Sequence, residues 1–152
     1  MIKGQPLIIL LVEDDPAHAE IVRRNLADFR VVNKIIHVAD GQEALDYLFR
    51  QAAYADPNSS PRPDLILLDL RLPKVDGLEV LAQIKKDQEL KQIPTVVLTT
   101  SAAESDIAQA YGNGTSSYLV KPVDFEKFAN LMKAFDFYWL AWNRFPKEEE
   151  EM

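Results

Sequence analysis

Five short strand-like segments recur along the chain, two of them continuously apolar and the other three built around shorter apolar stretches, and segments with helical spacing separate them. The five are Leu7–Val12, Asn33–Val38, Leu65–Leu68, Thr95–Leu98 and Ser116–Val120. Continuous apolar runs of this length are typical of strands that are buried on both faces, as in parallel sheets. Strands that alternate with helices need right-handed crossovers, which place helices on both faces of the sheet. The sequence therefore predicts an α/β fold with a doubly wound, five-stranded parallel sheet and five helices.

The segments between the strands place apolar residues on one helical face. Ala17–Asp28 has this spacing, and the preceding Pro16 suits a first helical turn. Further helices are expected after Asp40-Gly41, over Leu78–Ile84, over Glu104–Tyr111, and from Asp124 to about Arg144. Tyr54–Pro63 contains three prolines and is expected to be a loop.

The final helix is expected to extend beyond the sheet. Asp124 is placed as its N-cap, with Val123 positioned to pack on Phe128. A helix that reaches Arg144 is roughly 30 Å long, whereas a typical strand spans about 17–20 Å. The overhanging turns are aromatic, and such a patch predicts a protein–protein surface, with partial burial in the core as the alternative. The residues expected at this surface are Phe137, Tyr138, Trp139, Trp142 and Phe145.

Length and charge limit the class of protein. The chain has 152 residues and is expected to form one domain over residues 1–145, followed by an acidic tail over residues 146–152. Its net charge of −7 argues against direct nucleic-acid binding. It has no cysteine, so disulfides and thiol catalysis are excluded. No apolar run approaches the roughly 20 residues of a membrane span and no signal peptide is apparent, so a cytoplasmic location without membrane contact is expected.

Four of the strands end in residues that suit the handling of a phosphoryl group. These residues are Glu13, Asp14 and Asp15, then Asp69, then Thr99 and Thr100, and finally Lys121 before Pro122. The carboxyl ends of parallel strands meet in one crevice, where open α/β sheets bind their ligands. So many neighbouring acids would repel one another unless a hard cation takes up the charge, and oxygen ligands suit Mg²⁺. The sequence therefore predicts a Mg²⁺ site beside an aspartate that can be phosphorylated.

Each of these residues, taken alone, also has a structural interpretation. Asp69 could cap or form a turn, and Asp15 is the best candidate for a simple helix-start role before Pro16. Lys121 could pair with one of the acids, because a buried lysine is costly without a partner. Thr99 and Tyr118 could be ordinary strand residues. Only the complete set of these residues is specific for the handling of a phosphoryl group.

That set resembles the receiver domain of two-component response regulators. The similar segments are Leu11–Asp15, Asp64–Asp69, Pro73–Gly77, Val97–Thr99 and Tyr118–Pro122. The resemblance runs in order from about Leu7 into the final helix. It implies a flavodoxin-like sheet with the strand order 2-1-3-4-5.

The resemblance also implies a role for each matching position. Asp69 would accept a phosphoryl group from a sensor histidine kinase, with Lys121 on the phosphoryl oxygens. Thr99 and Tyr118 would form the switch. Mg²⁺ would be held by Asp14, Asp69 and the backbone carbonyl of Arg71, with Glu13 acting mostly through a metal-bound water. The Lys121–Pro122 bond would be cis. The protein would be a phosphoacceptor with intrinsic autophosphorylation and autodephosphorylation, not an enzyme acting on other substrates.

A narrower resemblance is to the single-domain response regulators of cyanobacterial phytochrome histidine kinases. It rests on the long Tyr54–Pro63 connection and on the aromatic C-terminus that ends in Arg144-Phe145-Pro146. It implies a phytochrome-type kinase as partner and a homodimer formed through the C-terminal elements. Arg71 and Thr100 occupy positions that vary in the family and flank the phosphoryl group, so the lifetime of the phosphorylated state is not predicted.

Three other functions remain as alternatives. A phosphatase with an aspartate nucleophile would want a second acid two residues after Asp69, where Arg71 stands. A flavin-binding electron carrier would share the fold, but the acidic loop after the first strand would repel the flavin phosphate. A receiver-like scaffold that works without phosphorylation is the third alternative, because a complete motif does not prove its use.

Overall fold

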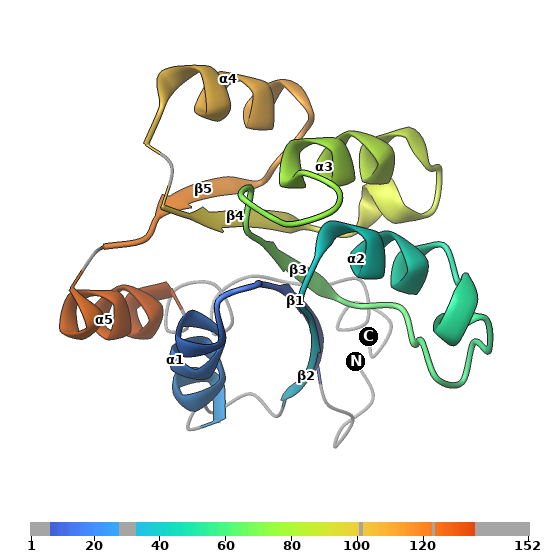
Figure 1. Cartoon of the computed structure of the whole chain (residues 1–152), viewed down its shortest axis with the longest axis horizontal. Helices are drawn as coiled ribbons and strands as arrows, with labels where there is room; N and C mark the ends of the chain where they lie inside the picture. Colours follow the sequence, from blue (N-terminus) through green and yellow to red (C-terminus); the bar gives the residue numbers. More distant parts are fainter. Residues whose placement is uncertain (1–6, 28–32, 101, 123, 136–152) are drawn as a thin grey trace, which may run out of the picture.

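Five parallel strands form one sheet in the order β2-β1-β3-β4-β5 (Figure 1). The computed structural model describes residues 7–27, 33–100, 102–122 and 124–135. The strands are β1 (Leu7–Val12), β2 (Asn33–Val38), β3 (Leu65–Leu68), β4 (Thr95–Thr99) and β5 (Ser117–Val120). The predicted fold class and strand order are confirmed. The boundaries differ by one residue at two strands, because Thr99 still pairs with Val120 while Ser116 precedes the ladder.

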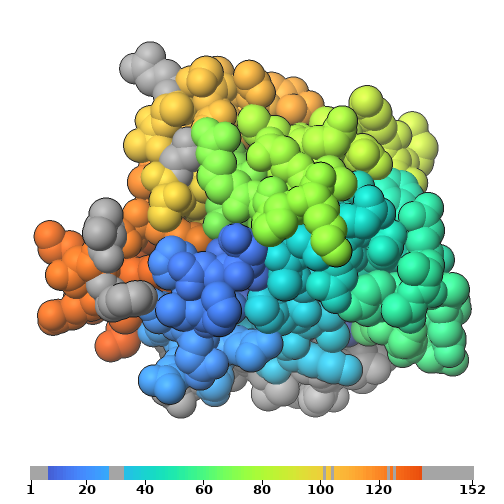
Figure 2. All heavy atoms as spheres, viewed as in Figure 1, coloured from blue at the N-terminus to red at the C-terminus, as the bar shows by residue number. Residues whose placement is uncertain are grey.

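Helices cover both faces of the sheet (Figure 1). One face carries α1 (Pro16–Ala27) and α5 (Phe125–Phe135), which contact each other and lie side by side in Figure 2 in blue and orange. The other face carries α2 (Gly41–Leu48), α3 (Gly77–Lys86) and α4 (Glu104–Gly112). Two short 3₁₀ helices, η1 (Ala52–Tyr54) and η2 (Leu90–Gln92), follow α2 and α3. None of the described helices is long and apolar enough to cross a membrane.

The core has two halves because successive side chains of a strand point to opposite faces. Leu10, Ile66 and Val97 pack under α2, α3 and α4, whereas Ile9 and Leu67 pack under α1 and α5. These side chains are almost fully buried. Burial of each stabilises the fold by about 1.5–3 kcal/mol. The central strands are therefore rigid supports for whatever follows their carboxyl ends.

Aspartates fix the starts of four helices. Asp15 Oδ1 accepts from the Ala17 amide at 2.9 Å, which confirms its predicted role before α1. Asp40 Oδ1 accepts from the Glu43 amide at 2.7 Å, and Asp76 Oδ2 accepts from the Leu78 amide at 3.3 Å. Asp124 Oδ1 accepts from the amides of Glu126 and Lys127, which confirms it as the N-cap of α5. Val123 lies outside the described residues, so its predicted contact with Phe128 stays a prediction.

The proline-rich connection before β3 packs on the end of α2. Tyr54 belongs to η1, so the loop is one residue shorter at its start than expected. Tyr47 donates its hydroxyl to the carbonyl of Pro61 at 2.5 Å. The hydroxyl of the fully buried Ser60 donates to the carbonyls of Tyr54 and Asp56. Buried side chains of α2 and of the loop thus donate hydrogen bonds to the carbonyl groups of Pro61, Tyr54 and Asp56.

Two glycines allow the β3–α3 loop to lie close to its neighbours. A Cβ on Gly77 would stand 2.3 Å from the carbonyl oxygen of Asp69, and a Cβ on Gly41 would stand 1.8 Å from the carbonyl oxygen of Val75. Both distances are far inside van der Waals contact. The Gly77 amide also donates to the carbonyl of Leu70 at 2.9 Å. The loop after Asp69 is therefore closely packed at two places: against Gly77 at Asp69 and Leu70, and against Gly41 at Val75.

One sequence expectation was wrong. The Lys121–Pro122 bond was expected to be cis, but the described residues contain no cis peptide bond. The trans form is the intrinsically preferred one, by about 0.5–1 kcal/mol before proline. Another expectation lies outside the description: α5 is described only to Phe135, so its predicted extension to Arg144 and the aromatic residues beyond it stay predictions.

Candidate functional site

Charged residues from three strand ends meet at the carboxyl edge of the sheet. Glu13 follows β1, Asp69 follows β3 and Lys121 follows β5. The Lys121 ammonium donates to Glu13 Oε1, and it donates to Asp69 Oδ2 at 3.0 Å. The structure therefore brings together the acids and the lysine that the sequence predicted as one crevice.

This charged group lies inside the protein. Glu13, Lys121 and Asp69 are only 1%, 3% and 6% exposed. Such side chains are almost never buried without partners, because desolvation of a lone charge is costly. Here two carboxylates share one ammonium, so the buried group carries a net negative charge when both acids are ionised. The predicted pairing of Lys121 with an acid is confirmed.

The two carboxyl groups respond differently to this environment. Burial raises the pKa of Glu13 to about 7, and the nearby Asp69 charge adds to the effect while Lys121 opposes it. Burial also acts to raise the pKa of Asp69, but the charge of Lys121 and hydrogen bonds from Thr99, Lys121 and the Arg71 amide outweigh it. The pKa of Asp69 is therefore lowered. Asp69 stays ionised while Glu13 takes up the first proton.

Glu13 should make the metal-free protein less stable as the pH rises. Its pKa is about 7 in the folded protein against an ordinary value of 4.5. Between these values Glu13 binds more protons in the folded protein than in the unfolded chain, so its contribution to the free energy of unfolding falls with rising pH, whereas His18, whose pKa is lowered, contributes in the opposite direction. Glu13→Gln cannot titrate and is expected to remove that fall.

Urea unfolding with EDTA at several pH values between about 5 and 7 measures this slope. Glu20→Gln is the matched control, because Glu20 lies on α1 and pairs with Arg24 at the surface. An unchanged slope in Glu13→Gln would contradict the prediction.

Three carboxylates fit a divalent cation. Glu13, Asp14 and Asp69 each offer an oxygen, and these atoms all lie within 4.8 Å of one another. Asp14 is exposed, so the group opens to solvent on its side. Oxygen-only donors at this density suit a hard divalent ion, which would offset the net negative charge of the buried group. The predicted donor cluster is present.

Asp69 is held at both carboxylate oxygens. Its Oδ1 accepts from the Arg71 amide at 3.1 Å, while Oδ2 faces Lys121. Thr99, fully buried at the end of β4, hydrogen-bonds the Asp69 carboxylate through its side chain. The Lys121 amide donates to the Thr99 carbonyl at 2.7 Å, which ties β5 to β4 at this level. Tyr118, the other predicted switch residue, is partly buried against the core under α2, α3 and α4.

The site includes residues that sequence reasoning missed. His18 Nδ1, on α1, lies 3.1 Å from Lys121 Nζ, and the Phe128 ring of α5 lies 6.0 Å from the same nitrogen. Asp106, on α4, pairs with the guanidinium of Arg71. The only sequence signal for His18 was its position three residues after Asp15. Phe128 was noted solely as a packing residue, and nothing in the sequence singled out Asp106.

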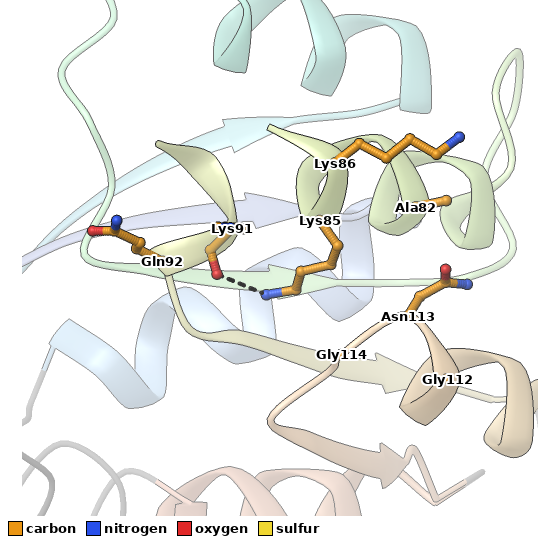
Figure 3. A pocket seen from close by; sticks show the side chains of 8 residues that line it. All are labelled: Ala82, Lys85, Lys86, Lys91, Gln92, Gly112, Asn113 and Gly114. Atoms are coloured by element: carbon orange, nitrogen blue, oxygen red, sulfur yellow. Dashed lines mark hydrogen bonds between the residues drawn. The ribbon is translucent and has the colours of Figure 1, made fainter. Parts of the chain in front are cut away.

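A separate pocket lies at the opposite edge of the sheet, where α3 and α4 end. It has a volume of about 660 Å³, and Lys85, Lys86 and Lys91 line it together with Gly112–Gly114 (Figure 3). Lys85 Nζ lies 3.4 Å from the carbonyl oxygen of Lys91. Its lining contains none of the predicted site residues. The pocket is therefore distinct from the acid cluster.

Comparisons with known proteins agree with this geometry. The family model described as the response regulator receiver domain matches residues 9–133. "Probable methanogenesis regulatory protein FilR2" of Methanothrix harundinacea is 46% identical over 93% of this chain and 88% of its own length. Response regulator Rcp1 of a Synechocystis strain is 42% identical over 89% of this chain and 90% of its own.

Two solved structures are similar to the whole described fold. The Mn²⁺-bound form of Rcp1 superposes with a TM-score of 0.88 at 40% identity. The phosphorylated cyanobacterial phytochrome response regulator RcpA superposes with a TM-score of 0.87 at 41% identity. Each match covers 93% of this chain and 99% of the other.

Proposed function

The chain belongs to the response regulator receiver family of two-component systems, and on this premise we propose that Asp69 accepts a phosphoryl group from a sensor histidine kinase. The observation that carries the proposal is the buried Glu13–Lys121–Asp69 group beside an exposed Asp14. An ionised aspartate with a lowered pKa is a competent nucleophile. Replacement of a buried ion pair by apolar side chains is often neutral or stabilising, so a scaffold that never becomes phosphorylated would not require two buried acids that share one lysine.

The phosphoryl transfer is a displacement at phosphorus. One Asp69 oxygen forms the new P–O bond, the P–N bond to the kinase histidine breaks, and that nitrogen keeps the electron pair and takes a proton. Such a transfer needs mainly positioning and neutralisation of charge. The Arg71 amide and Lys121 orient the Asp69 oxygens, and Lys121 then contacts the phosphoryl oxygens as a point charge.

Glu13, Asp14, Asp69 and the backbone carbonyl of Arg71 are the proposed ligands of Mg²⁺, with Glu13 acting through water. A bound cation would offset the negative charge that the phosphoryl group brings to two acids. The donor set suits Mg²⁺, and the existence of a Mn²⁺-bound form of the relative Rcp1 supports a divalent ion in this chain. Mg²⁺ itself is our proposal.

Signalling would proceed through altered protein–protein association. Thr99 already reaches the Asp69 carboxylate, so its hydroxyl is placed to follow a phosphoryl group, and Tyr118 would move with it. The proposed homodimer uses Phe137, Tyr138, Trp139, Trp142 and Phe145, all outside the described residues. One domain over residues 1–145 with an acidic tail, a cytoplasmic location and the absence of nucleic-acid binding also stay predictions.

A phytochrome-type histidine kinase is the proposed donor, and the likeness to phytochrome response regulator RcpA supports it. The 46% identity to a protein named for methanogenesis regulation favours a kinase of another sensory class as the second candidate. Phosphotransfer rates from one kinase of each class, measured with Mg²⁺ by intact mass, decide between them.

The phytochrome-type kinase is expected to transfer at least about tenfold faster, which corresponds to about 1.4 kcal/mol in the barrier. Faster transfer from the other kinase would overturn the pairing but not the phosphoacceptor role. Absence of label from both kinases and from acetyl phosphate would overturn the phosphoacceptor role and leave a receiver-shaped binding module.

A further inference from the structure

A histidine on the edge strand reaches the main chain of the acidic turn. His37 Nε2, on β2, lies 2.7 Å from the carbonyl oxygen of Glu13. Its Nδ1 lies 3.1 Å from Nη2 of Arg23, on α1. His37 is partly buried, so these contacts form at the rim of the fold. The imidazole thus connects α1 to the residue at which the chain leaves β1.

The two partners decide where the imidazole proton lies. A carbonyl oxygen can only accept a hydrogen bond, so Nε2 carries the proton. A guanidinium can only donate, so Nδ1 is unprotonated. These contacts correspond to the Nε2–H tautomer of His37, with both ring nitrogens in use.

This contact completes the fixation of the Glu13 peptide groups. The Glu13 amide donates to the carbonyl of Val38 at 3.1 Å, and the Glu13 carbonyl accepts from His37. Two residues of β2 thus hold both backbone polar groups of Glu13: Val38 holds the amide and His37 holds the carbonyl. Asp14 follows Glu13 directly in the chain. The orientation of the Glu13 carbonyl therefore also sets the position from which the exposed Asp14 side chain extends.

We propose that His37 is a positioning residue for the divalent cation site, acting through the Glu13 carbonyl on the Glu13 and Asp14 carboxylates. Without the Nε2–H donor, the turn could rotate about the bonds that follow Glu13, and the three carboxylates would no longer converge on one point. The inference rests on the proposed metal site. Groups that orient metal ligands in this indirect way typically change affinity by 10–100-fold when removed.

The test measures Mn²⁺ dissociation constants of the full, unphosphorylated chain by electron paramagnetic resonance. His37→Leu removes the donor and is expected to weaken binding about tenfold. His37→Gln is expected to bind near the wild-type level, because its amide can donate to the Glu13 carbonyl and accept from Arg23. Arg23→Gln is the matched control, since it leaves the Nε2–H donor in place.

Asp14→Asn separates the two hypotheses. If Asp14→Asn binds Mn²⁺ as the wild type does, the metal site itself is wrong. If Asp14→Asn loses binding while His37→Leu keeps it, only the role of His37 is overturned. Thermal unfolding without metal shows whether His37→Leu folds. If His37→Leu does not fold, the imidazole ¹⁵N chemical shifts of the wild type test the inference instead. A proton on Nδ1 of His37, and not on Nε2, would overturn it.

Discussion

Asp69→Asn is expected to abolish phosphorylation by every donor. The amide has no carboxylate oxygen that can form an acyl phosphate, so the loss is complete and not a matter of rate. Acetyl phosphate or a histidine kinase with Mg²⁺ should add one phosphoryl group to the wild type and none to the variant. Intact mass measures the difference directly, and EDTA added before the donor should prevent labelling of the wild type.

The variant should remain folded, so loss of label reports on the chemistry. Asp69 is one of two carboxylates that share Lys121, and the charge of Asp69 helps to raise the pKa of Glu13. Removal of its charge therefore leaves Lys121 paired with Glu13. Asp46→Asn, on α2 and outside the site, is the matched control and should label normally. Phosphorylation of Asp69→Asn at the wild-type level would refute the assignment of the phosphoacceptor.

Lys121→Met is expected to lower the free energy of unfolding by about 3–5 kcal/mol near pH 8, because two buried carboxylates would lose their only shared cation among the described residues. Methionine has a similar length and should fill the space. Protonation of the carboxylates relieves the repulsion, so the loss should shrink as the pH falls. Urea unfolding of metal-free protein measures both effects.

A divalent cation should restore part of the stability of Lys121→Met, since it would supply positive charge to the same carboxylates. The increase in unfolding free energy on addition of Mg²⁺ should therefore be larger in the variant than in the wild type. Lys86→Met is the matched control, because Lys86 is an exposed lysine on α3. Equal stability of Lys121→Met and wild type would show that the buried ion pairs contribute nothing to folding.

Much of the site could be predicted because it lies in and around the strand ends. The apolar runs mark where each strand lies. The residues that directly follow a strand lie at the carboxyl edge of the sheet, however the helices pack. Asp69 after β3 and Lys121 after β5 are positioned in this way. The rest depends on how helices and the edge strand pack. His18 approaches Lys121 from α1, and Asp106 approaches Arg71 from α4. Their sequence separation carries no signal of these contacts.

The sequence by itself determined the fold class, the strand order through its family resemblance, and the acids, threonine and lysine that meet in the crevice. Periodicity and strand ends are local properties, so they can be read before folding. Only the tertiary structure decided that Glu13 and Asp69 share one buried ammonium, and that the pKa of Glu13 rises while that of Asp69 falls. It alone placed His37 on the Glu13 carbonyl and made the Lys121–Pro122 bond trans. Desolvation and side-chain contacts arise from residues far apart in the chain, so they exist only after the layers have packed.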